Sequence, residues 1–90
     1  MIVVRMIKAA YLISKADPRT VFKCADKFAK QVSKIEKCDY RITNEEYGII
    51  LKIFVHQRKL LGELERRLEH IKGAKIRFVG AESDPNEPSS

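Results

Sequence analysis

The fold is decided by residues 38–56, which read CDYRITNEEYGIILKIFVH. Apolar and polar side chains alternate over residues 38–43, and residues 47–56 are almost continuously apolar. Alternation with a period of two, and short runs rich in β-branched and aromatic residues, are typical of β-strands. Asn44-Glu45 between the two segments is a turn signal. These residues therefore predict a β-hairpin.

A helix is predicted on each side of the hairpin. Asp17 can cap free backbone N–H groups, and Pro18 is tolerated at the first helical position. From there to Lys37 the apolar residues recur at spacings of four, three, four and three, which indicates one face of an amphipathic helix. They are Val21, Ala25, Phe28, Val32 and Ile35. Residues 57–72 return to helical spacing, and Gly73 follows where a left-handed C-cap belongs.

Two further strands complete the pattern. Residues 2–13 and residues 74–79 both have strand character. The order β-α-β-β-α-β, with right-handed crossovers, predicts an α+β fold of the ferredoxin-like type: a four-stranded antiparallel sheet with two helices on one face. We expect a single domain over residues 1–79. The acidic tail over residues 80–90, with two prolines and three serines, is expected to be disordered.

The chain is small and basic. Its 90 residues fit one domain with a marginal core, and small domains often gain stability by association. All 18 Lys and Arg but only nine of the 12 acids precede residue 80, so the predicted domain carries a formal charge of +9 (18 − 9). That charge favours a phosphate-rich or acidic partner, and ordinary solubility is the alternative interpretation.

The sequence indicates a cytoplasmic protein without a membrane segment. The apolar residues 1–14 are interrupted by Arg5 and Lys8, are too short to span a bilayer, and do not form a convincing signal peptide. One helix joining Cys24 and Cys38 would place them about 20 Å apart, whereas a disulfide needs Cα atoms within about 7 Å. We therefore expect two reduced thiols.

The expected fold leaves one face of the sheet open. The aliphatic set of the third strand, which should face the helices, is Ile49, Leu51, Ile53 and Val55. Ile50 and Phe54 are then on the open face. The better core set of the first strand is Ile2, Val4, Met6, Ala10 and Leu12, with a bulge or register change at Lys8. Ile7 and Tyr11 are then expected on the open face as well.

An apolar centre with a basic rim is expected on this face. The rim residues are Arg41, Lys75 and Arg77. Such a face can be covered by another protein, since monomers rarely expose large apolar patches, or it can stack RNA bases on Tyr11 and Phe54. Only Gly48 and Phe54 match the motif of RNA-recognition domains, and aliphatic residues stack poorly, so a protein interface in a homo- or heterodimer is preferred. Its candidate residues are Ile7, Tyr11, Ile50 and Phe54.

A row of lysines is the second candidate surface. Its members are Lys23, Lys27, Lys30, Lys34 and Lys37. They are offset from the apolar stripe of the first helix by two residues, or about 200°, and so line its solvent side. Such a row can follow the backbone of tRNA or another RNA without reading its sequence. A solvated helix face is the alternative.

The residues that catalysis would need are not gathered in the sequence. Neither His56 nor His70 has a cysteine or carboxylate at metal-ligand spacing, and the glycines are too scattered for a phosphate-binding loop. We therefore expect no catalytic residue, no metal and no cofactor, and a function in binding.

Residues 51–68, which read LKIFVHQRKLLGELERRL, resemble the small dimerising subunit of the KEOPS tRNA-modification complex (the CTAG/Pcc family). In that family the second strand of a hairpin also runs with almost no loop into a helix. The first strand, the polar turn and the helix that follows Asp17-Pro18 are similar too, so the resemblance extends over residues 2–71. It implies a non-catalytic subunit that pairs through its sheet and helps a complex to hold tRNA.

The leading hypothesis is therefore an accessory subunit of an RNA-modifying assembly. Two alternatives stay open, because the fold alone does not decide function. One is a free-standing RNA-binding or ribosome-associated module. The other is a small-molecule-binding regulatory domain, although residues 14–17 lack the Gly-rich or Asp/Asn-rich turn that it would need.

Overall fold

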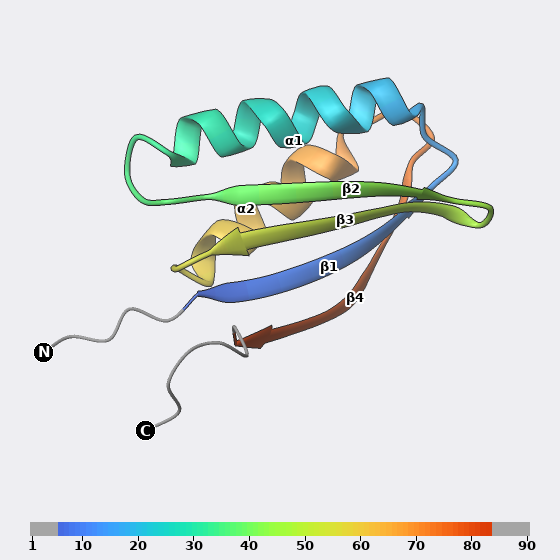
Figure 1. Cartoon of the computed structure of the whole chain (residues 1–90). Helices are drawn as coiled ribbons and strands as arrows, with labels where there is room; N and C mark the ends of the chain where they lie inside the picture. Colours follow the sequence, from blue (N-terminus) through green and yellow to red (C-terminus); the bar gives the residue numbers. More distant parts are fainter. Residues whose placement is uncertain (1–5, 84–90) are drawn as a thin grey trace, which may run out of the picture.

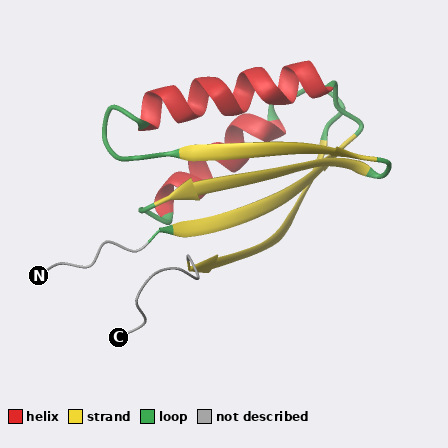
Figure 2. Cartoon of the chain, viewed as in Figure 1, coloured by secondary structure: helices red, strands yellow, loops and turns green. Residues whose placement is uncertain are grey.

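The structure, a computed structural model, describes residues 6–83 (Figure 1). Its elements follow the predicted order: β1 (Ile7–Ser14), α1 (Pro18–Val32), β2 (Asp39–Glu45), β3 (Gly48–Val55), α2 (Lys59–Glu69) and β4 (Lys75–Ser83). The strands form one antiparallel sheet in the order β2-β3-β1-β4. Both helices cover the same face of this sheet, and the other face is open (Figure 2). The ferredoxin-like α+β fold predicted from the sequence is confirmed.

The first helix begins where the sequence predicted but ends earlier. The Asp17 carboxylate accepts a hydrogen bond from the Arg19 N–H at 2.9 Å, and Pro18 lies in the first turn. Both features stabilise a helix start. At the other end the helix stops at Val32, whereas the sequence predicted it to continue to Lys37.

The early end of α1 has a tertiary cause. The Glu36 carboxylate accepts hydrogen bonds from the His56 N–H and from Gln57 Nε2, the latter at 2.7 Å. These bonds tie the turn after α1 to the junction between β3 and α2, and so lead the chain away from the helix axis. Ile35, which the spacing placed on the apolar face of the helix, is 72% exposed as a result.

Replacing Glu36 by alanine is expected to lower the free energy of unfolding by about 1.5 to 3 kcal/mol, because hydrogen bonds to a charged acceptor are lost. Urea denaturation followed by circular dichroism measures this change. Glu36→Gln keeps one oxygen acceptor and should retain part of the stability. Glu46→Ala, at an exposed position in the hairpin turn, is the control and should change stability by less than about 0.5 kcal/mol. Equal effects of the two alanine variants would contradict the role of Glu36.

The first strand was predicted in the wrong register. Ala9, Tyr11 and Ile13 are fully buried against the helices, whereas the sequence placed Ala10 and Leu12 in the core. The β1–β3 ladder runs without a shift and pairs each buried residue of β1 with a buried residue of β3. Because side chains alternate with a period of two, an error of one residue moves every side chain to the other face. Two residues of the predicted core set lie outside the described residues: Ile2 and Val4.

The last strand is longer than predicted. The sequence predicted a strand over residues 74–79 and a disordered tail over residues 80–90, but β4 pairs with β1 as far as Ser83. The β1–β4 register shifts at Val79, where an extra residue forms a β-bulge and the strand then continues. The predicted boundary between domain and tail is therefore wrong. Residues 84–90 lie outside the described residues.

The core lies between the sheet and the two helices. The inward residues of β3 are buried as predicted: Ile49, Leu51, Ile53 and Val55. Four members of the apolar stripe predicted for the first helix are buried: Val21, Ala25, Phe28 and Val32. In α2, Leu61, Leu64 and Leu68 are buried at helical spacing. The C-cap predicted at Gly73 is wrong, because α2 ends at Glu69 and its C-cap is His70 in a right-handed conformation. Gly73, with a φ of +79°, lies in the turn that follows. Within residues 6–83 no helix has the length and apolar character needed to cross a membrane.

Candidate interaction surfaces

The open face of the sheet carries an apolar strip. Leu12 of β1 pairs with Ile50 of β3, so these two half-buried side chains are neighbours. Phe54, also half-buried, lies on the same face of β3. At the bulge of β4, Val79 is 60% exposed and lines a hollow of about 270 Å³ together with Ala10. These four residues are called the open-face strip: Leu12, Ile50, Phe54 and Val79.

Cationic side chains lie between and beside the residues of the open-face strip. Lys52 lies between the apolar residues of β3, and Arg41 is its partner on β2. Arg77 and Lys75 extend the same face along β4. Asp39 of β2 also lies on this face. A surface that covers the strip must therefore combine apolar residues with carboxylates or phosphates.

Two of the four predicted interface residues lie on the wrong face. Ile50 and Phe54 are on the open face, but Ile7 and Tyr11 point towards the helices, because β1 has the other register. The Tyr11 hydroxyl is buried with no hydrogen-bond partner among the described residues, and burial together with the Glu65 charge raises its pKa. Phe54 is left as the one aromatic residue that the described strands present on the open face. A platform for stacking several bases is therefore not formed there.

The row of lysines is shorter than the sequence predicted. The five candidates were Lys23, Lys27, Lys30, Lys34 and Lys37. The first three are exposed on α1, and Lys34 lies in the following turn, where it lines the same hollow as Lys30. Lys37 lies beyond that turn and outside the row, because α1 ends at Val32. The lysine row therefore consists of Lys23, Lys27, Lys30 and Lys34.

One member of the lysine row is engaged within the chain. The Lys30 ammonium lies 2.9 Å from the Asp26 carboxylate, which also accepts a 3.0 Å hydrogen bond from the Tyr40 hydroxyl. These two donors lower the pKa of Asp26. The other three lysines of the row make no ion pair within residues 6–83. They present uncompensated positive charge to the solvent.

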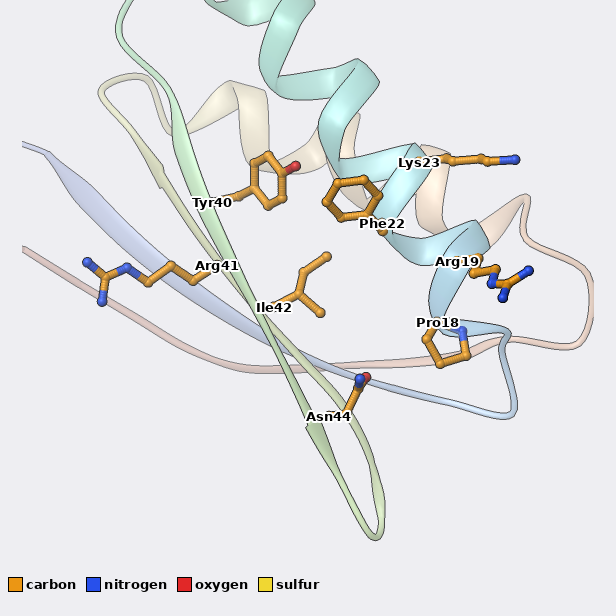
Figure 3. Close-up of a pocket in the computed structure, with 8 residues that line it drawn as sticks. All are labelled: Pro18, Arg19, Phe22, Lys23, Tyr40, Arg41, Ile42 and Asn44. Carbon is orange, nitrogen blue, oxygen red and sulfur yellow. The ribbon is translucent and has the colours of Figure 1, made fainter.

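A groove between α1 and β2 is a third surface, which the sequence did not predict (Figure 3). Its volume is about 530 Å³, and its apolar walls are Phe22 of α1 with Tyr40 and Ile42 of β2. The rings of Phe22 and Tyr40 meet edge to face with centroids 6.0 Å apart. Phe22 nevertheless remains 51% exposed. Pro18 lines the groove at the start of the helix.

Positive charge surrounds the groove. Its cationic lining residues are Arg19, Lys23 and Arg41, and Asn44 contributes an amide. Figure 3 shows Phe22, Tyr40 and Ile42 turned towards one another between helix and strand, whereas Arg41 points to the other side of β2. No carboxylate lines the groove within the described part of the chain. The sequence could have singled out Phe22, a large apolar residue outside the apolar stripe of its helix, but not the strand that faces it.

The two cysteines of the chain are free thiols that are disfavoured as nucleophiles. Cys24 and Cys38 are both free, as expected. Burial and the nearby Asp39 and Glu36 charges raise the pKa of Cys38 to about 11, and burial raises that of Cys24. A raised pKa disfavours the thiolate, which is the nucleophilic form. Residues 6–83 contain no group of three or more side chains placed to hold a metal ion.

Comparisons with known proteins assign this chain to no family. No protein-family model and no curated protein matches the chain. Among solved structures, the crystal structure of PH0061 is similar, with a TM-score of 0.42 and 18% sequence identity. The similarity covers 83% of this chain and 52% of the other, so the chain spans about half the length of that protein.

Proposed function

We propose that this chain is a non-catalytic accessory subunit of a cytoplasmic RNA-modifying assembly. It pairs with a protein partner through the open face of its sheet, and it offers the lysine row to RNA. The observation that carries this proposal is that the two surfaces lie on opposite sides of the molecule. The buried residues of α1 face the sheet, so its lysines point away from the sheet and from anything bound to the open face.

The open-face strip supports the protein half of the proposal. Leu12, Ile50 and Phe54 are partly exposed, and further burial of apolar surface contributes about 25 cal/mol per Å². Lys52 and Arg41 beside them favour a partner that brings carboxylates to this face. A second copy of the chain would instead bring like charges together unless Asp39 of each copy offsets them. The charge pattern therefore favours a different protein over a second copy.

The lysine row supports the RNA half. Phosphate groups are spaced along a backbone, and ammonium groups on one side of a helix can contact several of them without reading bases. Residues 51–68 also resemble the small subunit of a tRNA-modification complex, which makes tRNA the favoured RNA. A free-standing module that stacks bases is less well supported, because Tyr11 is buried and is not available for stacking.

Replacing Lys27 and Lys34 together by glutamine is expected to weaken tRNA binding and to flatten its salt dependence. Each lost phosphate contact removes a slope of about 0.7 to 0.9 from the plot of log affinity against log salt concentration, so the pair should remove about 1.4 to 1.8. Fluorescence anisotropy with an unmodified tRNA transcript, titrated at several salt concentrations, measures this slope. Folding should be unaffected, because both side chains are exposed.

The control is a variant with the same loss of charge. Lys59 and Lys72 are also exposed but lie on α2 and in the turn after it. Their double replacement by glutamine should leave the slope nearly unchanged. If both double variants flatten the slope equally, the affinity for tRNA depends only on the net charge of the chain, and the proposal that the lysine row holds RNA is wrong.

A further inference from the structure

The edge of β2 is unusually suited to pairing with another strand. β2 is the outermost strand next to β3, so its other side has no strand partner within the described sheet. Its ladder with β3 runs through seven paired positions without a shift. The opposite edge, β4, is interrupted by the bulge at Val79, a feature that protects edges from pairing. An extended backbone placed beside β2 would meet a regular row of N–H and C=O groups.

We propose that the groove between α1 and β2 binds an extended acidic segment of a partner protein, which adds to the sheet as a strand beside β2. This site is separate from the open face and does not depend on the function proposed above. The alternating side chains of the added strand would point in turn into the groove and towards the open side of the sheet.

The groove offers apolar contacts to every second residue of such a strand. Phe22, Tyr40 and Ile42 line it, and Phe22 is half exposed although it lies on a helix that buries the rest of its large apolar residues. The hydrogen bond from the Tyr40 hydroxyl to Asp26, which Lys30 also contacts, fixes the Tyr40 ring. The wall is therefore formed before binding, which lowers the entropic cost of association.

The charges at the groove define the chemistry of the segment. Arg19 and Lys23 lie on the helix side, Arg41 lies on the open side of β2, and no carboxylate lines the groove within the described residues. Asp17 is nearby, but its carboxylate is engaged with the Arg19 N–H at the start of α1. On the open side of β2, Asp39 and Glu45 lie to either side of Arg41. The complementary segment therefore combines apolar residues that enter the groove with acidic residues that approach Arg41, Arg19 or Lys23.

A separate chain is the occupant that the structure favours. Ser83, the last described residue, pairs with Ile7 at the end of β1 remote from Pro18, and β4 is on the opposite edge of the sheet from β2. RNA is less well matched, because the aromatic rings of the groove pack edge to face against each other and the strand edge offers backbone hydrogen bonds to a peptide.

The test selects ligands from a phage-displayed library of random short peptides against the purified full chain. The expected result is enrichment of peptides in which acidic and apolar residues alternate. Phe22→Glu should weaken the binding of a selected peptide by about 30-fold or more, since a central aromatic contact is lost. Ile35→Glu is the matched control, because Ile35 is an exposed apolar residue outside the groove, and it should leave the affinity unchanged. Circular dichroism checks that both variants fold.

If the peptide binds as an added strand, its backbone must matter, whereas binding by charge alone would depend only on its side chains. Only every second N–H of an added strand bonds to β2. Two versions of the selected peptide, N-methylated at alternate positions in the two possible registers, should therefore differ: one should lose binding and the other should keep it. Arg41→Glu should weaken the binding of acidic peptides, because it reverses a charge beside the added strand, and it leaves the apolar wall of Phe22, Tyr40 and Ile42 unchanged.

Several results would overturn the proposal. They are the absence of any enriched acidic–apolar pattern, equal binding to wild type and Phe22→Glu, and equal binding of the two N-methylated peptides. Self-association of the wild type that is lost in Phe22→Glu would instead make a second copy the occupant. Binding of tRNA that is lost in Phe22→Glu but kept in Ile35→Glu would make RNA the occupant. Phe54→Glu separates this site from the proposed function, because it alters the open face and should leave peptide binding intact.

Discussion

Replacing Tyr11 by alanine is expected to lower the free energy of unfolding by about 3 to 5 kcal/mol, because a fully buried ring is removed from the centre of the core. The whole stability of a small domain is about 5 to 15 kcal/mol, so the variant should lose a large fraction of it and melt at a clearly lower temperature. The ring packs against Phe78 at a centroid distance of 5.4 Å, and its neighbour on β3 is Leu51. Urea and thermal denaturation measure the change.

The neighbouring residue provides the control for this prediction. Leu12 points to the open face and is only half-buried, so Leu12→Ala should cost about 1 to 2 kcal/mol. Tyr11→Phe should be neutral or stabilising, since it removes a buried hydroxyl without a partner. Because burial raises the pKa of Tyr11, its folded form holds the proton, and stability should fall as the pH rises above about 10, less so in Tyr11→Phe. If Leu12→Ala lowers the free energy of unfolding more than Tyr11→Ala does, Leu12 lies in the core, as predicted from the sequence, and the β1 register of the structure is wrong.

Replacing Phe54 by glutamate is expected to weaken the complex with the protein partner by about 30- to 1000-fold. Central aromatic residues of an interface contribute about 2 to 4 kcal/mol, and glutamate would also place a charge at a buried position. The circular dichroism spectrum should be unchanged, because Phe54 lies on the face without helices and its side chain is not in the core. Binding of the two purified proteins by isothermal titration calorimetry measures the loss.

The control for Phe54 is another aromatic residue at the surface. Tyr47 is 64% exposed in the hairpin turn, away from the open-face strip. Tyr47→Glu introduces the same charge and should leave the affinity within about threefold of the wild type. If Tyr47→Glu weakens the complex as much as Phe54→Glu does, the partner binds the hairpin end and not the sheet face.

The element order was predictable because each element has a local signal. In the hairpin, apolar and polar side chains alternate over residues 38–43, and residues 47–56 are almost continuously apolar. Asp17-Pro18 begins a helix, and helical spacing marks one buried stripe on each helix. These signals depend on neighbours within a few residues of one another, so the sequence alone contains them. The open face followed from this order and from the alternation of β3.

Other features depend on contacts between distant residues. The β1 register was missed because Tyr11 can pack inside or stack outside, and only the ladder with β3 decides between the two. The early end of α1 depends on hydrogen bonds that His56 and Gln57, just after β3, donate to the Glu36 carboxylate. The groove at Phe22 needs α1 and the edge strand to be neighbours, which the spacing of either segment does not show.

We expect this chain to hold a protein partner and RNA at the same time, on opposite sides of the molecule. Sedimentation velocity with fluorescently labelled tRNA, the chain and the partner that co-purifies with it from its host tests this most directly. One faster-sedimenting species that contains the chain, the partner and the tRNA is expected. Phe54→Glu should remove only the partner from it, and the double replacement of Lys27 and Lys34 only the tRNA. Competition between tRNA and the partner for the chain, or a wild-type chain that sediments as a monomer with neither, would contradict the account.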